Sequence, residues 1–372
     1  MATGGTLGSS GGAAGDIVGS GGAASGGRGG GDAGAGGRGP GPGGAGGATP
    51  GGGGGGAASL DPTLLAQCAG TNPIRCTIPV PANGNYDVTV ELGSATAAST
   101  SRIQAELFRI VVPPASLAAG AFAQHTFSVN VRAESHDGYS APGKVLDLII
   151  DGTAPALHGL GFAASPSSPT IFIAADSTVC DWDPTAANII DPIQRGWGQE
   201  LSQFLAAGIA VANYADSGET AATFYSKFFT PVKNSLRAGD YLFIQFGHND
   251  QKDSAAIAAY QANLMKYISD ARAKGATPVL FTPVARKGAT AADPGFEGLD
   301  QQVRDLAASQ NVVLVDLTAL TIAHYKAAAN VSMLFATATE GTHFSETGAT
   351  QVANLAAQAL KTSALPLKTF VK

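Results

Sequence analysis

Charged residues are few in this sequence, and basic residues are nowhere clustered. Charged side chains make up 13% of the 372 residues, and the formal net charge is −6 at pH 7. A nucleic-acid-binding surface needs lysine and arginine gathered on one face, so the composition excludes nucleic acid as the main partner. Long apolar runs are missing as well. Because a spanning helix needs about 18 or more consecutive apolar residues, we expect no membrane span.

Apolar residues are also scarce in residues 1–59, which consist mostly of glycine, alanine and serine. Such a segment cannot bury enough apolar surface to offset the entropy lost on ordering. We expect a disordered, glycine-rich tether. The alternative, a glycine-rich structural domain, lacks the strict three-residue period of collagen. The first ten residues, MATGGTLGSS, lack the charged and apolar regions of a signal peptide, so the sequence does not show export directly.

Cysteine is rare, with three residues in the chain. Cys68 and Cys76 flank a short polar turn, and a disulfide between them would imply an oxidising compartment. Two unpaired thiols are the alternative. Cys180 is then the odd residue, and we expect it to pack in the first turn after Ser177. A tether joined to a domain with a disulfide is typical of a secreted or surface-anchored protein.

Residues 60–166 show the two-residue period of β-strands. Polar and apolar residues alternate at 85–92 and at 125–132, and shorter apolar runs occupy 103–112 and 145–150. Turn-forming residues separate these runs, and no helical period competes. We therefore expect an all-β sandwich here. Such a module either binds carbohydrate or braces its neighbour, and composition does not choose between the two.

From residue 167 to the end, short apolar runs alternate with amphipathic helical stretches. This rhythm is typical of a parallel sheet with crossover helices, and we expect a three-layer, doubly wound α/β domain with a five-stranded sheet. Its ligand site should lie at the carboxyl ends of the strands. The expected strands are 170–175, 209–213, 241–246, 277–281 and 312–316, and the expected helices are 198–207, 255–274, 298–309, 317–328 and 348–361.

The first of these strands ends in a candidate nucleophile, Ser177. A serine hydroxyl needs a neighbouring base to attack at neutral pH. Of six histidines, His343 lies three residues after Glu340, a spacing that lets one short turn present a base and the carboxylate that orients it. His248 follows another strand and can face the same site. The G-x-S-x-G elbow of ordinary α/β-hydrolases is absent, which disfavours that arrangement.

Two further blocks carry groups that can stabilise an oxyanion. Gly218 follows the second strand, where a missing side chain lets a backbone N–H approach the substrate closely. Asn249, in the run GHND at 247–250, has an amide that can donate to an oxyanion. We interpret Asp176 and Asp250 as residues that hold the loops by accepting hydrogen bonds from backbone amides, rather than as catalytic groups.

These blocks together resemble the four blocks of the SGNH (GDSL-type) hydrolase superfamily. They are Ala175-Asp176-Ser177, Gly218, Gly247-His248-Asn249-Asp250 and Glu340-Gly341-Thr342-His343-Phe344. A narrower resemblance is to the rhamnogalacturonan acetylesterase family. It lies in RGWGQ at 195–199, GDYLFIQFGHND at 239–250, and THF at 342–344 with Gly348-Ala349. The resemblance covers about 169–361. Bacterial members often carry an N-terminal β domain, which residues 85–150 resemble.

The resemblance implies a flavodoxin-like SGNH fold and a role for each matched residue. Ser177 would be the nucleophile, His343 the general base and Glu340 the third triad member. The backbone N–H groups of Ser177 and Gly218 and the side chain of Asn249 would form the oxyanion hole. Two positions depart from the pattern: Ala175 replaces the usual glycine, and Glu340 replaces the usual aspartate. With the longer Glu340, either its carboxylate or a backbone carbonyl orients His343.

The implied activity is removal of acetyl groups from rhamnogalacturonan, through an acyl-enzyme and without a metal or organic cofactor, by a secreted monomer. Arg286, after the 277–281 strand, can pair with a uronate carboxylate, or it belongs to a solvated loop pair with Lys287. Trp197 either stacks on a sugar or anchors packing at a helix start, and His248 is a third candidate for substrate contact. Two rivals stay open: an esterase for acetylated xylan, a lipid or a thioester, and a non-catalytic glycan-binding surface protein.

Overall fold

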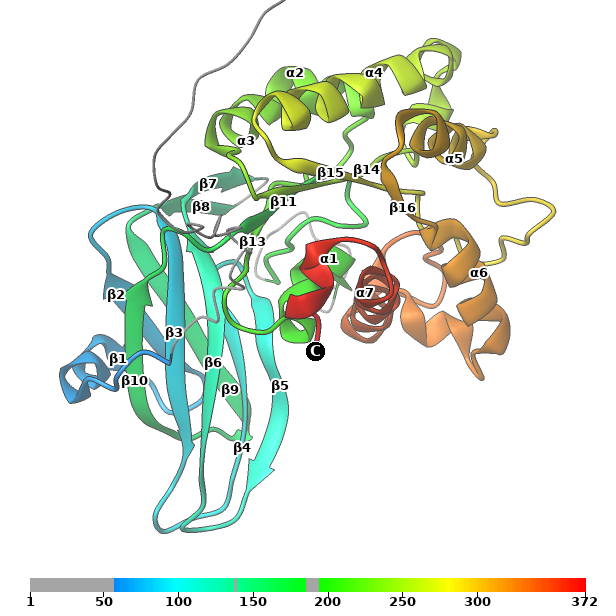
Figure 1. Ribbon diagram of the computed structural model, residues 1–372. Helices are drawn as coiled ribbons and strands as arrows, with labels where there is room; N and C mark the ends of the chain where they lie inside the picture. Colours follow the sequence, from blue (N-terminus) through cyan, green and yellow to red (C-terminus); the bar gives the residue numbers. More distant parts are fainter. Residues whose placement is uncertain (1–56, 137–138, 185–193) are drawn as a thin grey trace, which may run out of the picture. The chain divides into compact units, whose positions relative to one another are not determined.

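A computed structural model describes residues 57–136, 139–184 and 194–372 (Figure 1). The described residues form one compact unit. The tether expected at 1–59 lies outside the described residues except for its last three. We call residues 60–166 the β module and residues 167–372 the α/β domain.

The β module consists of antiparallel strands in two main sheets, as the sequence predicted, but the run at 103–112, expected as one strand, contains the turn between β4 and β5. The sheet orders are β1-β2-β9-β4-β5 and β10-β3-β6, and β7 and β8 form a separate hairpin. Val88 of one sheet and Ile103 of the other belong to the same core, so the sheets pack face to face. The strands are β1 (Cys68–Ala69), β2 (Ile74–Pro79), β3 (Gly84–Gly93), β4 (Ser99–Ala105), β5 (Arg109–Leu117), β6 (Phe122–Val131), β7 (Ala133–His136), β8 (Tyr139–Pro142), β9 (Val145–Ala154) and β10 (Leu157–Ala164).

A disulfide joins Cys68 and Cys76 across the first strand pair, with an S–S distance of 2.01 Å. The prediction of a bridge is therefore confirmed over that of two thiols. Cys180 is buried, and its Sγ lies 3.5 Å from the carbonyl oxygen of Ser177, as expected for a residue packed in the first turn after it.

The polar face of β3 and β6 is buried where it meets the α/β domain, whereas its Glu91–Gln124 end is exposed to solvent. Asn85 Nδ2 donates to the carbonyl oxygen of Ser168 and to Thr170 Oγ1, both at 2.9 Å. The N–H of Gly208 donates to Ser128 Oγ at 2.8 Å. The alternation that makes one face of these strands polar therefore supplies hydrogen-bonding groups to the α/β domain, while the apolar face fills the sandwich.

The α/β domain contains the five-stranded parallel sheet that the sequence predicted, in the order β13-β11-β14-β15-β16. Alternate residues of β11 face opposite layers: Ile171 and Ile173 pack in one core, and Phe172 and Ala174 in another. Helices α2 to α5 cover one face of the sheet, and α1, α6 and α7 cover the other (Figure 1). The strands are β11 (Thr170–Ala175), β13 (Ala210–Asn213), β14 (Tyr241–Gln245), β15 (Thr277–Phe281) and β16 (Val313–Val315).

The helices differ from expectation in two places. The helix expected at 198–207 is a four-residue α1 followed by a 3-10 turn, Leu201–Phe204, and two helices between β13 and β14 were not predicted. A capping box at Thr220 begins the first of these. The helices are α1 (Trp197–Glu200), α2 (Ala221–Lys227), α3 (Phe229–Ser235), α4 (Ser254–Ala273), α5 (Leu299–Gln310), α6 (Leu317–Ala327) and α7 (Glu346–Lys361).

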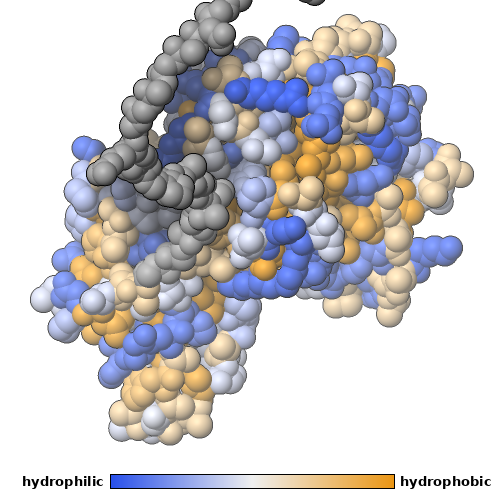
Figure 2. All heavy atoms as spheres, in the orientation of Figure 1, coloured by the Kyte–Doolittle hydropathy of each residue, from blue (hydrophilic) through white to orange (hydrophobic). Residues whose placement is uncertain are grey.

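A short antiparallel pair links two loops of the α/β domain. It is formed by β12 (Gln194–Arg195) and β17 (Phe344–Ser345), which directly follows His343. Within the described ranges, no helix has the length and apolar content needed to cross a membrane. Hydrophilic residues are interspersed among hydrophobic ones on the visible face of the described part (Figure 2).

Candidate active site

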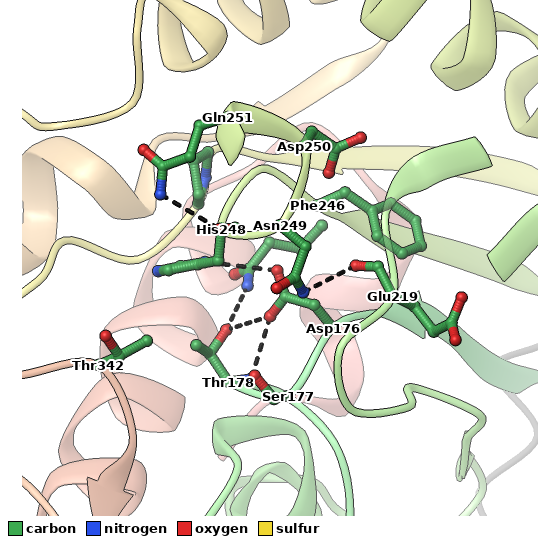
Figure 3. Close-up of polar contacts among 12 residues, drawn as sticks. Asp176, Ser177, Thr178, Glu219, Phe246, His248, Asn249, Asp250, Gln251 and Thr342 are labelled. Atoms are coloured by element: carbon green, nitrogen blue, oxygen red, sulfur yellow. Dashed lines mark hydrogen bonds and ion pairs between the residues drawn. The ribbon is translucent and has the colours of Figure 1, made fainter. Parts of the chain in front are cut away.

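The candidate nucleophile lies in a tight turn at the carboxyl end of the buried strand β11. The N–H of Val179 donates to the carbonyl oxygen of Asp176 at 3.0 Å and closes this turn around Ser177. Asp176 Oδ1 accepts from the N–H of Thr178 at 3.0 Å and from its hydroxyl at 2.8 Å (Figure 3). Asp176 therefore holds the turn through amide and hydroxyl bonds, as the sequence suggested.

His343 contacts this serine from a loop at the far end of the chain. Its Nε2 lies 3.0 Å from Ser177 Oγ, although the two residues are 166 positions apart. This is hydrogen-bonding distance. When the neutral imidazole carries its proton on Nδ1, its Nε2 accepts a hydrogen bond from the Ser177 hydroxyl. The structure thus brings together the two residues that the sequence proposed as nucleophile and base.

Glu340 shapes the histidine loop without bonding to the imidazole. Its Oε1 accepts from three successive backbone N–H groups, those of Gly341 at 3.0 Å, Thr342 at 2.7 Å and His343 at 3.2 Å. The same oxygen lies 3.6 Å from His343 Nδ1, beyond hydrogen-bonding distance. Among the described residues this Nδ1 has no hydrogen-bond partner. Glu340 acts on His343 through its charge and through the loop that it caps.

The pKa values of His343 and Glu340 are both lowered, each for a different reason. Burial lowers the pKa of His343 below its ordinary value of 6.5, and the negative charges of Glu340 and Asp176 only partly oppose it. Burial alone would raise the pKa of Glu340, but the N–H bonds from Thr342 and His343 outweigh it and the pKa falls. At neutral pH the imidazole is uncharged and Glu340 is a carboxylate, which is the state that a general base requires.

A second histidine–carboxylate pair lies beside the first. His248 Nδ1 is 3.3 Å from Asp176 Oδ2, and the two side chains are 3% and 0% exposed. The His248 ring packs edge-on against Phe296, with centroids 5.1 Å apart. Its Nε2 has no hydrogen-bond partner among the described residues. With its side chain 3% exposed, His248 offers little surface to a substrate, and its Nδ1 lies at Asp176, so its contact with substrate stays a prediction.

The oxyanion hole of Ser177, Gly218 and Asn249 stays a prediction, and the structure shows how each of these donor groups is bonded. Neither the N–H of Ser177 nor that of Gly218 has an acceptor in the part of the chain that the structure describes. Gly218 has φ +79°, a conformation that other residues rarely adopt. Asn249 Nδ2 donates one bond to the carbonyl oxygen of Glu219 at 3.0 Å (Figure 3). Lys252 Nζ donates to Asn249 Oδ1 at 2.8 Å. The amide is fixed, and its second N–H remains for a ligand.

Asp250 anchors a neighbouring helix. Its Oδ1 accepts from the N–H of Ala221, the first residue of α2, at 3.0 Å. Burial raises the pKa of Asp250 to about 7. This contact agrees with the interpretation of Asp250 as a loop-holding residue.

Arg286 lies against the histidine loop. Its Nε donates to Thr342 Oγ1 at 3.2 Å, one Nη donates to the carbonyl oxygen of His248 at 3.4 Å, and the guanidinium lies 5.8 Å from the Phe296 ring centroid. Burial lowers the pKa of Arg286, while the charges of Asp176 and Glu340 oppose the change. Within the described residues Arg286 forms no ion pair, so its charge is available to an anionic ligand.

Trp197 is a packing residue, and its prediction as a sugar platform is wrong. The side chain is 0% exposed, its Nε1 donates to Gln245 Oε1 at 3.0 Å, and its ring packs on Phe281. The glycines on either side cause this burial. A Cβ on Gly196 would lie 2.3 Å from the carbonyl oxygen of Cys180, so the segment packs against the nucleophile loop with no room for a ligand.

Trp182 is the residue that sequence reasoning missed. Its Nε1 donates to the carbonyl oxygen of Ser177 at 3.1 Å, and its ring meets the His343 ring edge to face at 5.9 Å. It therefore touches both members of the serine–histidine pair. The one signal in the sequence is its place, five residues after Ser177 and on the same loop.

A doubly wound parallel sheet with a serine–histidine pair at its carboxyl rim and no nucleophile elbow defines a serine hydrolase of the GDSL type. The model of the GDSL-like Lipase/Acylhydrolase family matches residues 176–351. The rhamnogalacturonan acetylesterase RhgT of Bacillus subtilis is 33% identical over 218 residues, which cover 53% of this chain and 92% of the relative. The chain belongs to the GDSL-like lipase/acylhydrolase family and is a serine-type ester hydrolase.

Further similarities are to other esterases and to solved structures. A probable rhamnogalacturonan acetylesterase, YesY of Bacillus subtilis, is 34% identical over 214 residues, covering 53% of this chain and 94% of the relative. A crystal structure of another Bacillus subtilis protein has 26% identity and a TM-score of 0.48, covering 78% of this chain and 80% of that one. An acetylxylan esterase from Geobacillus stearothermophilus has 18% identity and a TM-score of 0.42, with 54% and 96% covered.

Proposed function

We propose that this protein removes acetyl groups from rhamnogalacturonan, a pectic polysaccharide, with Ser177 as nucleophile and His343 as general base. The observation that carries the proposal is the 3.0 Å contact between Ser177 Oγ and His343 Nε2. It occurs in a chain about one third identical to a rhamnogalacturonan acetylesterase and to a probable one. Two relatives with the same substrate in their names favour this polymer over other acetylated glycans.

Acylation begins when His343 Nε2 takes the proton of Ser177 Oγ as that oxygen attacks the acetyl carbonyl carbon. The carbonyl oxygen becomes an oxyanion, which accepts bonds from the N–H groups of Ser177 and Gly218 and from the Asn249 amide. Each such donor lowers the barrier by about 3 kcal/mol. When the intermediate collapses, the C–O bond to the sugar breaks and the imidazolium returns its proton to the sugar oxygen.

Deacylation repeats these steps with water. His343 takes a proton from the water as its oxygen attacks the acetyl-serine carbonyl, and the same donors hold the oxyanion. Collapse breaks the bond to Ser177 Oγ, which recovers a proton from His343, and acetate leaves. Each proton is thus moved by this chain's own residues.

Glu340 is the proposed third member of the triad. Its charge favours the imidazolium that forms during attack, and its Oε1 caps the loop that presents His343. The Nδ1 of His343 lies 3.6 Å from this oxygen, beyond hydrogen-bonding distance, so the proposed role of Glu340 rests on its charge and on the loop that it caps.

Arg286 is the proposed contact for a galacturonate carboxylate. It is held by Thr342, next to His343, and within the described residues no carboxylate forms an ion pair with it. A guanidinium presents a planar fork that suits a carboxylate better than a lysine does. A neutral acetylated glycan gains nothing from this contact, so Arg286 would favour pectic over xylan substrates.

The Cys68–Cys76 disulfide supports a location outside the cytoplasm, since such bonds persist in oxidising compartments. We propose that the protein acts at or beyond the cell surface, as a monomer. Activity in a cell-free culture fraction and the mass of the purified protein in solution check these two points.

Acetate release tests the proposed function. We expect release from acetylated rhamnogalacturonan, less from acetylated xylan, and none from either with Ser177→Ala. Release from xylan alone would keep the roles of Ser177 and His343 and discard the pectic substrate. Binding of the polymer without release of acetate would favour a glycan-binding protein instead.

A further inference from the structure

A buried ion pair connects the β module to the nucleophile loop. Arg109, the first residue of β5, contacts Asp181 Oδ2 through Nε at 2.8 Å and through Nη2 at 2.6 Å. The two side chains are 3% and 0% exposed. The other oxygen of Asp181 accepts from Asn213 Nδ2 at 2.8 Å, at the end of the neighbouring strand β13. Asp181 lies four residues after Ser177, so this pair fixes the loop that leaves the nucleophile.

A glutamine makes a second connection between the same two parts. Gln199 Nε2 donates to the carbonyl oxygen of Leu107 in the β module and to that of Trp182, both at 3.0 Å. Its Oε1 accepts from the N–H of Trp182 at 3.2 Å. The backbone of Trp182 is therefore held on both sides by one side chain, which is itself tied to the β module.

The residue held in this way contacts the reacting groups. Trp182 donates to the carbonyl oxygen of Ser177 and packs edge-on against the His343 ring. A shift of Trp182 would move both contacts at once. The Ser177–His343 distance is thus coupled, through Trp182 and its neighbours, to the β module.

Arg109 is surrounded by other buried ionisable groups. Glu134 Oε1 lies 3.0 Å from an Nη of Arg109 and 2.7 Å from an Nη of Arg132, so it bridges the two guanidinium groups. Burial raises the pKa of Glu106 to about 8, which leaves that carboxyl neutral at pH 7. Burial also raises the pKa of Asp181, and the charge of Arg109 opposes that change. Arg109 and Arg132 thus lie among three carboxyl groups, of which Glu134 and Asp181 contact Arg109 directly. Loss of one member of these ion pairs leaves an unpaired buried charge, which costs far more than loss of an exposed pair.

We propose that Arg109 is a positioning residue of the active site, supplied by the β module, which holds the Asp181–Trp182 segment against Ser177 and His343. This inference rests on the proposed roles of Ser177 and His343. It assigns the β module a part in catalysis that does not require the module to bind sugar. Arg109 touches no substrate; it acts through Asp181 and Trp182.

The test compares variants of the full chain on a small activated acetyl ester, which is too small to contact the β module. For Arg109→Met we expect kcat to fall about 10- to 100-fold, the loss typical of a misplacement near 1 Å, with KM nearly unchanged. The rate at which a fluorophosphonate labels Ser177 should fall in parallel. Arg109→Lys keeps the positive charge but not the planar guanidinium, and it should retain more of the wild-type kcat than Arg109→Met does.

Ser128→Ala is the matched control. It removes a bond between the same two parts of the protein, to the N–H of Gly208, which precedes β13 and so lies at the amino edge of the sheet, away from Ser177. We expect Ser128→Ala to lower Tm and to leave kcat and the labelling rate unchanged. If both variants lost activity only in proportion to their loss of Tm, Arg109 would be a structural residue and the inference would be overturned.

A second variant covers the case in which Arg109→Met does not fold. Trp182→Phe keeps an aromatic ring but removes the indole N–H that reaches Ser177. We expect kcat to fall less than in Arg109→Met, on the order of 10-fold for one lost hydrogen bond. In the double variant with Arg109→Lys, the loss of kcat should be smaller than the product of the two single losses, because both substitutions act on the contact between Trp182 and Ser177. Unchanged kcat in Trp182→Phe, or full multiplication, would overturn the inference.

These outcomes are distinct from failure of the proposed function. If the wild type cleaves no acetyl ester, or if Ser177→Ala cleaves as well as the wild type, the proposed roles of Ser177 and His343 are wrong, and the inference falls with them. If the wild type and Ser177→Ala behave as proposed and Arg109→Met matches the wild type, the positioning role alone is wrong.

Discussion

Two histidine–carboxylate pairs lie side by side at the nucleophile, and they are built in opposite ways. His343 contacts Ser177 but stands 3.6 Å from its carboxylate, Glu340. His248 is 3.3 Å from its carboxylate, Asp176, and both side chains are almost fully buried. The pair with the closer acid is thus not the pair that reaches the nucleophile.

The difference shows that a close histidine–acid contact does not by itself identify a catalytic pair. The Asp176–His248 pair lies in the interior and supports the turn that carries Ser177. The Glu340–His343 pair lies in a loop, where one oxygen of Glu340 is occupied by three backbone N–H groups. We therefore expect Asp176–His248 to stabilise the fold around Ser177, and Glu340–His343 to take part in the reaction. Substitution of single members of each pair can separate the two roles.

Replacement of the two histidines should give the largest contrast. His343→Gln removes the base, and we expect kcat/KM to fall by on the order of 10⁴- to 10⁶-fold, as for other groups that act as a unit. His248→Gln removes only support for Asp176, and we expect a loss of roughly 10- to 100-fold. Acetate release by both variants, with circular dichroism to verify folding, measures the contrast. Equal losses would mean that His248 takes part in the chemistry.

Asp176→Asn should mainly affect stability. The pKa of Asp176 is lowered because its bonds to His248 and Thr178 outweigh the effect of burial. A depressed carboxyl pKa adds stability that is present above 3.8 and is lost as the pH falls through the lower, folded value. We expect the variant to lose about 1–3 kcal/mol of unfolding free energy at pH 7.

Urea unfolding of Asp176→Asn and the wild type at pH 7 measures that loss. His248→Gln is the matched control, because it removes one of the bonds to Asp176 and keeps those from Thr178. An Asp176→Asn protein as stable as the wild type would show that the buried carboxylate contributes nothing net.

Glu340→Gln should have a modest effect. When a triad acid that is hydrogen-bonded to its histidine is neutralised, kcat falls by about 10⁴-fold. Since Glu340 is beyond bonding distance and a glutamine oxygen can still cap the loop, we expect a loss of roughly 10-fold or less. Glu340→Ala, which also removes the cap, should lose more. A loss near 10⁴-fold in Glu340→Gln would show that the bond to Nδ1 forms during the reaction.

The smallest expected effect is on the pH profile. The pKa of His343 is lowered by burial, so the acid limb of kcat/KM should lie below 6.5. The negative charge of Glu340 opposes that shift, so Glu340→Gln should move the limb to still lower pH. A limb that moved to higher pH would contradict the assignment of the limb to His343.

Most of the fold, and the serine–histidine pair, could be predicted from local sequence patterns. The apolar run of β11 and the break at Asp176 located the nucleophile, because strand and turn signals are local. The spacing of Glu340 and His343 made His343 a candidate base, and the resemblance of the four blocks to the SGNH pattern singled it out. Helices α2 and α3 were missed because Tyr225, Phe228 and other aromatic residues there have weak helical propensity, and packing on the sheet stabilises them instead.

Contacts between distant segments could not be predicted from such patterns. Arg109 and Asp181 are 72 positions apart, and Leu107 and Gln199 are 92 apart. Nothing in the residues around either member marks it as a partner of the other. For Trp197 the sequence left two alternatives, a sugar platform and a packing anchor, and the close approach at the glycines beside it, which buries the ring, agrees with the second. Long-range packing, not local preference, decides which tryptophan meets the site.

One guanidinium joins segments of the chain that lie far apart in the sequence. Arg102 in β4 pairs with Asp151 at 2.7 Å and with Glu346 at 2.8 Å, and Glu346 follows Arg102 by 244 positions. Asp151 belongs to the same β module as Arg102, whereas Glu346 begins α7, so one side chain pairs with a carboxylate from each part of the protein. A single substitution at Arg102 therefore removes an ion pair within the β module and one between the two parts.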